Sequence, residues 1–193
     1  MAVTSTMLPL GTSAPGFSLP DATTGDTVSI TDFEQAPVLL VMFISNHCPY
    51  VKHVADELAR VGRDYAPRGV AVVAIGSNDI GTHPADAPAR MVEFSAERGF
   101  TFPYVYDESQ AVALAYRAAC TPDLYVFDAG RALVYRGQLD SSRPANDVPV
   151  DGRDLRAALD AALDGQSVPE PHQPSIGCNI KWKPANAPDY FLA

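Results

Sequence analysis

The stretch FISNHCPYVKH, residues 43–53, places one cysteine, Cys48, directly before a proline. It follows the apolar run 38–44, and apolar residues recur at helical spacing from Val51 onward. Proline suits the first position of a helix because it has no N–H group to leave unpaired. The free N–H groups and partial positive charge at a helix start stabilise a thiolate, which is the reactive form of cysteine. We therefore expect Cys48 to act as a nucleophile and not as inert filling of the core.

The motif around this cysteine contains no second thiol, because Val51 stands three residues after Cys48. The other two cysteines of the chain are Cys120 and Cys178. Three cysteines do not make a disulfide scaffold, and an odd number leaves at least one thiol free or available for exchange. The cysteine usage therefore indicates redox chemistry more than structural cross-linking.

The histidines near the cysteine allow two interpretations. His47 and His53 flank it, and an imidazole can polarise a thiol or act as a base. Alternatively both face solvent, which we favour for His53 and leave open for His47. Lys52 could add positive potential on the same helix face, although a solvated lysine is the simpler interpretation. His83 and His172 lie in expected loops without metal-ligand spacing, so we assign them no role.

The chain alternates apolar runs with helical periodicity. The β-branched, continuously apolar runs predict strands buried on both faces, and residues spaced three and four apart predict helices. Short alternating pieces near residues 17–19 and 28–30 predict a small N-terminal hairpin. We expect strands at 38–44, 70–76, 102–107, 123–128 and 132–139, and helices at 51–65, 89–99, 109–119 and 152–165.

This order predicts an α/β fold. Strands joined by helices pair in parallel, while the last two strands form an antiparallel hairpin, so the sheet is mixed and flanked by helices. At 193 residues we expect one domain, residues 1–165. Residues 166–193 are rich in proline and lack a long period, so they predict an irregular C-terminal tail packed on the domain.

Composition restricts the partners. Acidic residues outnumber basic ones 23 to 14, which gives a formal charge of −9. Nucleic acid and anionic membrane surfaces are therefore poor candidates. The apolar run 38–44 is far shorter than the ~20 residues that span a bilayer, and residues 1–11 do not resemble a secretory leader. We expect a cytoplasmic protein without a cofactor; the sequence does not decide its oligomeric state.

Three segments together carry a family resemblance. APGFSLPDATTGDTVSITDF, VLLVMFISNHCPYVKH and ACTPDLYVFDAGRALVYRG resemble, in order, the start, active-site and proline-loop segments of the thioredoxin superfamily. The resemblance is to its redoxin branch, which includes peroxiredoxin-like (AhpC/TSA-like) proteins, and covers about residues 10–165. It implies a thioredoxin-like fold. It also implies that the bond between Thr121 and Pro122 is cis and that this proline lies beside the nucleophile.

The departures from the family decide between activities. Peroxiredoxins place a threonine three residues before the nucleophile and use an arginine to polarise peroxide. Ser45 and Pro122 occupy those two positions here, so Arg143 or Arg136 would have to substitute. Copper-delivery members have a second cysteine four residues after the first, where this chain has Lys52.

The sequence therefore predicts a thiol–disulfide oxidoreductase. The thiolate of Cys48 attacks a disulfide sulfur, and a distant thiol resolves the mixed disulfide. The substrate would be a protein or low-molecular-weight disulfide or thiol, and the resemblance implies that Thr121 and Pro122 shape the docking edge. Two alternatives stay open. One is a thiol peroxidase, and the other is a copper- or zinc-binding protein that uses Cys48, His47 and another cysteine.

Two cysteines compete for the resolving role. Cys120 lies two residues before Pro122, in a loop that the resemblance places next to the active site. Cys178 lies in SIGCNIKWK, where Gly177 permits close backbone approach and the tail could fold back across the domain. A disulfide requires Cα atoms within about 7 Å, and only Cys120 is held near Cys48 by the expected fold itself. We narrowly favour Cys120. Alternatively, Cys120 is a small buried apolar residue at a strand entry, and Cys178 is a free thiol on a packed tail.

Overall fold

The fold is built on a five-stranded mixed sheet. The structure, a computed structural model, describes residues 1–192, so Ala193 at the end of the expected tail lies outside the described residues. The sheet order is β6-β5-β4-β8-β9, in which β4 pairs in parallel with β5, and β5 with β6, while β8 is antiparallel to β4 and β9. These strands are β4 (Val38–Phe43), β5 (Val70–Gly76), β6 (Tyr104–Tyr106), β8 (Asp123–Phe127) and β9 (Leu133–Gly137). The expected mixed α/β sheet is confirmed.

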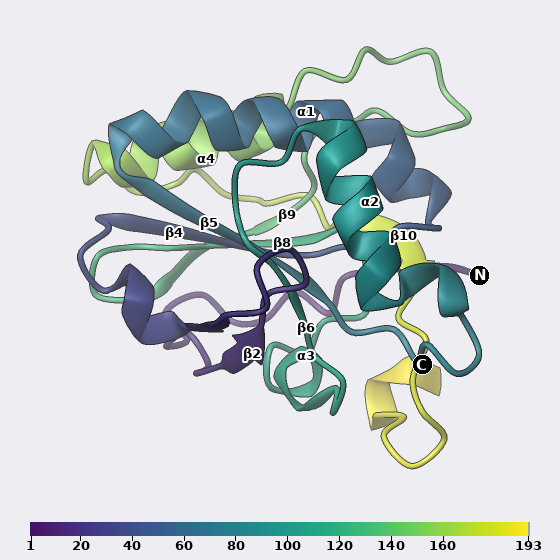
Figure 1. The fold of residues 1–193 in the computed structure, drawn as a ribbon. Coiled ribbons are helices and arrows are strands. Elements are labelled where there is room, and N and C mark those ends of the chain that lie inside the picture. The colour runs from purple at the N-terminus through teal and green to yellow at the C-terminus, as the bar shows by residue number, and fades with distance from the viewer. Residues whose placement is uncertain (193) are drawn as a thin grey trace.

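Helices cover both faces of this sheet (Figure 1). They are α1 (Pro49–Tyr65), α2 (Pro88–Arg98), α3 (Ala111–Ala115) and α4 (Arg153–Leu163). The first, second and fourth pack on one face and α3 on the other. The third helix is shorter than the expected 109–119 because Gln110 and Arg117 at its two ends have positive φ angles of 63° and 50°.

The central strand explains why its sequence is apolar at every position. All six residues of β4 are buried. Leu40 and Met42 face the core under α1 and α4, whereas Leu39 and Val41 face the core under α3. A strand covered on both sides therefore reads as a continuous apolar run. The start of α1 follows the carboxyl end of this central strand, at the same end of the sheet where the parallel strands β5 and β6 end.

The C-terminal tail is less irregular than expected. Strand β10 (Ile176–Asn179) lies between β1 (Ala2–Thr4) and β7 (Cys120–Thr121), antiparallel to both. Figure 1 shows β10 at the same side of the molecule as the N-terminus. A four-residue strand that contains a glycine and follows a proline-rich stretch has no period that a sequence pattern could reveal. The division into a domain 1–165 and a tail 166–193 stays a prediction.

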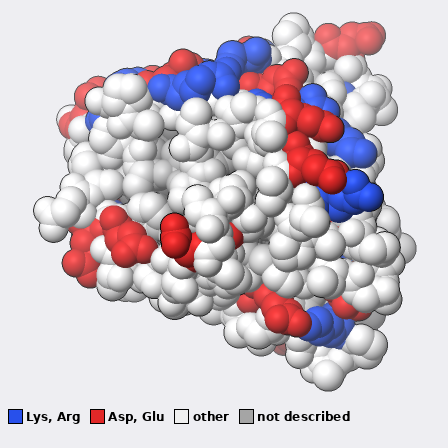
Figure 2. All heavy atoms as spheres, viewed as in Figure 1, with Lys and Arg blue, Asp and Glu red and all other residues white. Residues whose placement is uncertain are grey.

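The N-terminal hairpin is confirmed, since β2 (Ser18–Pro20) and β3 (Thr27–Ser29) pair antiparallel. Within residues 1–192, no helix is both long and apolar enough to cross a membrane. Figure 2 shows acidic and basic side chains interleaved over α1 and α2. Pairs such as Arg98 with Asp56 and Arg90 with Glu93 account for part of this mixture. That face therefore presents neither sign of charge alone.

One glycine controls how closely β10 approaches β7. A Cβ atom at Gly177 would lie 1.9 Å from the carbonyl oxygen of Thr121 and 2.6 Å from its carbonyl carbon. Both obstructing atoms belong to the backbone, which cannot move aside as the end of a flexible side chain could. The tail strand can therefore pack at this position only with glycine.

This contact predicts a loss of stability in Gly177→Ala. We expect the free energy of unfolding to fall by about 1–3 kcal/mol, the usual cost of overpacking, measured by urea denaturation. Gly16→Ala is the matched control, because nothing lies within 4 Å of a Cβ atom built there. It should change the free energy by less than about 0.5 kcal/mol. Equal effects of the two substitutions would contradict the close packing of β10 against β7.

Candidate active site

Cys48 caps the N-terminus of α1, as expected, with φ −67° and ψ 121°. Its side chain is fully buried, and its Sγ donates to the carbonyl oxygen of Thr121 at 3.1 Å. The Thr121–Pro122 bond is cis, as the resemblance implies. The structure thus brings together the expected nucleophile and the residues that begin the proline loop.

Cys178 lies against this site from the tail strand. In the β10–β7 ladder it is opposite Thr121, the residue whose carbonyl accepts from Cys48. Its side chain is half-buried and packs on the core cluster that contains Cys48. Burial, a hydrogen bond with Cys48 and the negative charge of Cys48 raise the pKa of the Cys178 thiol from 9.0 to about 11. The two cysteines therefore both lie against Thr121, and the Cys178 thiol holds its proton more firmly than an ordinary cysteine does.

Cys120 is also close but is directed elsewhere. It is fully buried, and its Sγ faces the carbonyl oxygen of Pro122 at 3.5 Å. Burial and the carboxylate of Asp123 raise the pKa of the Cys120 thiol well above 9.0, with smaller contributions from the other two cysteines. Of the other two cysteines, Cys178 is therefore the one that lies against the Cys48 site without being fully buried.

A buried carboxylate, which the sequence interpretation missed, organises the turn before Cys48. Asp86 ends the short 3₁₀ turn η3 (Pro84–Asp86) and is only 3% exposed. Its oxygens accept hydrogen bonds from the Ser45 hydroxyl at 3.0 Å, the Asn46 backbone N–H at 2.8 Å and the Asn78 amide at 2.7 Å. The ring Nδ1 of His47 lies 2.6 Å from the same carboxylate. One side chain therefore fixes all three residues that precede the nucleophile.

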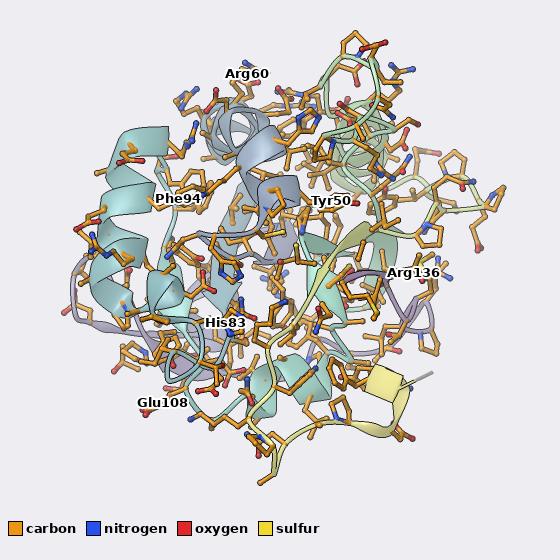
Figure 3. All side chains as sticks on the ribbon, turned by 90° about the vertical axis from the view of Figure 1, so that its right-hand side faces the viewer. Tyr50, Arg60, His83, Phe94, Glu108 and Arg136 are labelled. Atoms are coloured by element: carbon orange, nitrogen blue, oxygen red, sulfur yellow. The ribbon has the colours of Figure 1, made fainter. Side chains whose placement is uncertain are left out.

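This arrangement assigns the tautomer of His47. A carboxylate only accepts hydrogen bonds, so Nδ1 carries the proton and Nε2 of the neutral ring is an acceptor. His83 stacks on this ring at 5.1 Å between centroids, and Figure 3 shows it below Tyr50 of α1. Burial and the charge of His47 lower the pKa of His83. His83, to which the sequence assigned no role, thus lies beside the site.

His53 does not face solvent as we expected. It is half-buried, and its Nε2 lies 2.7 Å from the Ser142 hydroxyl. That hydroxyl donates to the carbonyl of Val148 at 2.6 Å, so it accepts from His53. The contact joins α1 to the loop after β9. His53 thus holds that loop in place, whereas Lys52 is exposed, as a solvated lysine would be.

The two arginines considered for peroxide activation form hydrogen bonds that hold parts of the fold together. Arg143 lines a hollow beside Pro122 but donates to the carbonyl oxygens of Asp140 and Ser142, both at 2.7 Å. Arg136 donates to Leu8 at 3.0 Å and lies 2.8 Å from the ring of His172. Neither arginine supports the peroxidase alternative. Likewise, no group of three His, Cys, Asp or Glu side chains that could hold a metal ion occurs among residues 1–192.

Two buried amides dock the segment that follows Cys178. The backbone N–H of Lys181 donates to Asn78 at 2.8 Å, and Gln110 donates to the Lys181 carbonyl at 2.8 Å. The Gln110 side-chain oxygen accepts from the Lys183 N–H at 2.8 Å. Asn78 follows the carboxyl end of β5, where polar residues commonly build sites in open α/β sheets. That position was the one sequence signal that could have identified Asn78.

The thioredoxin-like fold, the cysteine at the start of α1 and the adjacent cis-proline define a redoxin-type protein. The AhpC/TSA family model matches residues 10–136, and the chain belongs to that family. A Mycobacterium tuberculosis protein named "Putative peroxiredoxin" is 30% identical over 122 residues, which cover 63% of this chain and 71% of that protein.

Two solved structures match nearly the whole chain. An uncharacterised conserved protein from Geobacillus kaustophilus is 54% identical with a TM-score of 0.93, over 95% of this chain and 97% of that one. A hypothetical protein from Sinorhizobium meliloti is 49% identical with a TM-score of 0.92, over 94% and 98%. A thiol:disulfide interchange protein from Chlorobium tepidum shares the fold at 18% identity and a TM-score of 0.61, over 81% and 99%.

The carboxylate cluster predicts the effect of Asp86→Asn. An amide would point a donor at groups that themselves donate, so we expect the free energy of unfolding to fall by about 2–3 kcal/mol. In ¹⁵N NMR spectra, neutral His47 should lose its preference for the Nδ1–H tautomer. The exposed Asp26→Asn is the control and should change neither quantity. An unchanged tautomer in the Asp86 variant would refute this role for the carboxylate.

The buried Asp123 predicts a pH dependence of stability. Burial raises the pKa of its carboxyl from 3.8 to about 6, although hydrogen bonds from Ser5, Ala119 and Tyr125 oppose the rise. Because the pKa is higher in the folded state, the stabilisation is complete below pH 3.8 and is lost as the pH rises through 6. The free energy of unfolding of the native chain, measured relative to that of Asp123→Asn, should therefore fall by about 2–3 kcal/mol between pH 4 and pH 7.5. A constant difference between the two unfolding curves would contradict this.

Proposed function

We propose that this protein is a thiol–disulfide oxidoreductase whose reactive pair is Cys48 and Cys178. The observation that carries the proposal is that both cysteines meet at Thr121, beside the cis-proline: the Sγ of Cys48 donates to its carbonyl oxygen, and Cys178 lies opposite it in the β10–β7 ladder. Family membership supports the same class of chemistry, since the family model covers the segment that contains Cys48. The substrate would be a protein or low-molecular-weight thiol or disulfide.

The geometry supports a division of roles within the pair. Cys48 stands at the N-cap position of α1, where the partial positive charge of a helix start favours a thiolate. Thiolate is the nucleophile in exchange, so Cys48 attacks a disulfide sulfur of the substrate, whose other sulfur leaves as a thiolate. Cys178 then attacks Cys48 in the mixed disulfide, which forms the intrachain bond and releases the first substrate sulfur as a thiol. Thr121 and Pro122 would form the edge against which an extended substrate segment lies.

Cys120 has a different place in the proposal. Its preference as the resolving thiol, which came from the sequence, stays a prediction, but the contacts favour Cys178. The carboxylate of Asp123 and complete burial both keep Cys120 protonated. A neutral buried thiol is slow in exchange. We therefore assign Cys120 to the packing beneath the proline loop.

A second candidate function is a thiol peroxidase, which the name of the M. tuberculosis relative favours. In that reaction Cys48 would become a sulfenic acid and condense with Cys178 to a disulfide, with release of water. Ser45 weighs against it, because its hydroxyl donates to Asp86 at 3.0 Å. Because the proton of this hydroxyl is already used in a hydrogen bond, the hydroxyl cannot donate it to peroxide.

The pair predicts the behaviour of the three single cysteine variants. Cys48→Ser and Cys178→Ser should each lower the rate of disulfide exchange by at least about 100-fold, because each removes one sulfur of the reacting bond. Cys120→Ser is the matched control and should stay within about 3-fold of the native rate. Reduction of a model disulfide gives the rates, and peptide mapping without reduction identifies the disulfide.

The same variants separate the candidates. Cys178→Ser with full exchange activity would refute the proposed pair, and loss of the disulfide only in Cys120→Ser would transfer the role to Cys120. Peroxide consumption should be measured in parallel. If it depends on Cys48 and greatly exceeds the rate of disulfide exchange, the peroxidase function replaces the proposal.

A further inference from the structure

A pocket of about 200 Å³ lies between α4 and the C-terminal tail, and we refer to it as the α4–tail pocket. It is lined by Tyr135 of β9, by Asp154 and Ala157 of α4, and by tail residues between 168 and 173. Its described lining contains none of the three cysteines. The pocket is therefore separate from the candidate active site.

His172 supplies this pocket with a hydrogen-bond donor that has no partner. The residue is only 8% exposed, and the Arg136 guanidinium donates to its ring Nδ1 at 2.8 Å. Because a guanidinium only donates, Nδ1 is an acceptor and the proton of the neutral ring is on Nε2. Nε2 is buried and forms no hydrogen bond within residues 1–192. The carbonyl of Val168 favours a proton on the ring, but its geometry is not that of a hydrogen bond.

The geometry directs this donor into the pocket. The two ring nitrogens point away from each other, and Arg136, which bonds to Nδ1, is outside the described pocket lining, whereas His172 is part of it. Burial and the charge of Arg136 also lower the pKa of His172, so the ring is neutral near neutral pH. Native proteins seldom leave a buried donor unpaired, so the expected partner is an acceptor from outside the chain.

We propose that the α4–tail pocket binds a small uncharged alcohol or phenol, whose hydroxyl oxygen accepts a hydrogen bond from Nε2 of His172. The apolar part of the ligand lies against the Tyr135 ring, whose centroid is 4.7 Å from that of His172. The Tyr135 hydroxyl donates to the Gln138 carbonyl at 2.6 Å, so Tyr135 offers only its ring. This inference does not rest on the proposed function, since no cysteine takes part.

The polar groups of the pocket favour a neutral hydroxyl over a charged group. A carboxylate would pair with His172 but would also face the negative charge of Asp154. An ammonium has donors only and would leave Nε2–H unpaired. A hydroxyl both accepts and donates. Asp154 accepts from the Gln138 amide at 2.6 Å and has further acceptor positions for the ligand's proton.

The size of the pocket favours a ligand with a single ring. An apolar cavity of about 150 Å³ holds benzene. A pocket of about 200 Å³ therefore has room for one ring and a hydroxyl group.

The test compares phenol with toluene, which has nearly the same shape but carries a methyl group in place of the hydroxyl. Each is titrated into the native chain up to about 4 mM, a range in which ligands of this size bind measurably. NMR spectra follow the His172 Nε2–H signal and give the Kd. Ala157→Trp fills the pocket from an exposed position of α4. Ala89→Trp is the matched control, at an exposed position of α2 outside the pocket.

We expect phenol to shift the Nε2–H signal and to bind at least about 10-fold more tightly than toluene, because only phenol pairs the buried donor. Ala157→Trp should weaken phenol binding at least about 10-fold, because the indole occupies the space of the ligand. Ala89→Trp should leave the Kd within about 2-fold of the native value.

Three results would overturn the inference. Equal binding of phenol and toluene would show an apolar cleft without the hydrogen bond. Phenol binding that survives Ala157→Trp would place the ligand elsewhere. An Nε2–H signal that neither compound shifts would show that water alone pairs the His172 donor.

Discussion

The carbonyl group of Thr121 is the point on which the site depends. It accepts a hydrogen bond from Cys48, it precedes the cis-proline, and it lies where any side chain at position 177 would stand. Three segments far apart in the chain therefore meet at one backbone group. Because a carbonyl cannot shift without moving its strand, a change in any one of these segments alters the distance between the two thiols.

A buried polar network holds residues close to both thiols in the chain. Asp86 holds the residues that precede Cys48, and Asn78 bonds both to Asp86 and to the backbone of Lys181, just beyond Cys178. The position of each sulfur thus traces to a shared pair of buried side chains. Buried polar groups of this kind are costly unless every partner is present, so the network favours one geometry over nearby alternatives.

The sequence predicted what short-range patterns encode. The continuous apolar run at 38–44 predicted the central strand, and Cys48 before a proline predicted the start of a helix, because both depend on neighbouring residues alone. Asp86 and Gln110 gave no such signal, since a carboxylate or amide in a loop becomes part of a site only through partners distant in the chain. The sequence offered Cys178 as one of two candidates but could not place it, because β10 exists only through pairing with residues at positions 2–4 and 120–121.

Because Cys48 and Cys178 are far apart in the sequence, a disulfide between them would change the stability of the fold. In a Cys-x-x-Cys motif the disulfide closes a loop of a few residues, whereas here the thiols are 130 positions apart (178 − 48 = 130). In the chain-entropy model, a bond across a loop of that length stabilises the folded chain by about 4–5 kcal/mol. Oxidation would then fasten the tail strand to α1, and by linkage whatever stabilises the docked tail favours the oxidised pair. If Cys48 and Cys178 form this disulfide, the amides of Asn78 and Gln110 would shift its redox equilibrium without contacting either sulfur, because they hold the backbone of Lys181 just after β10.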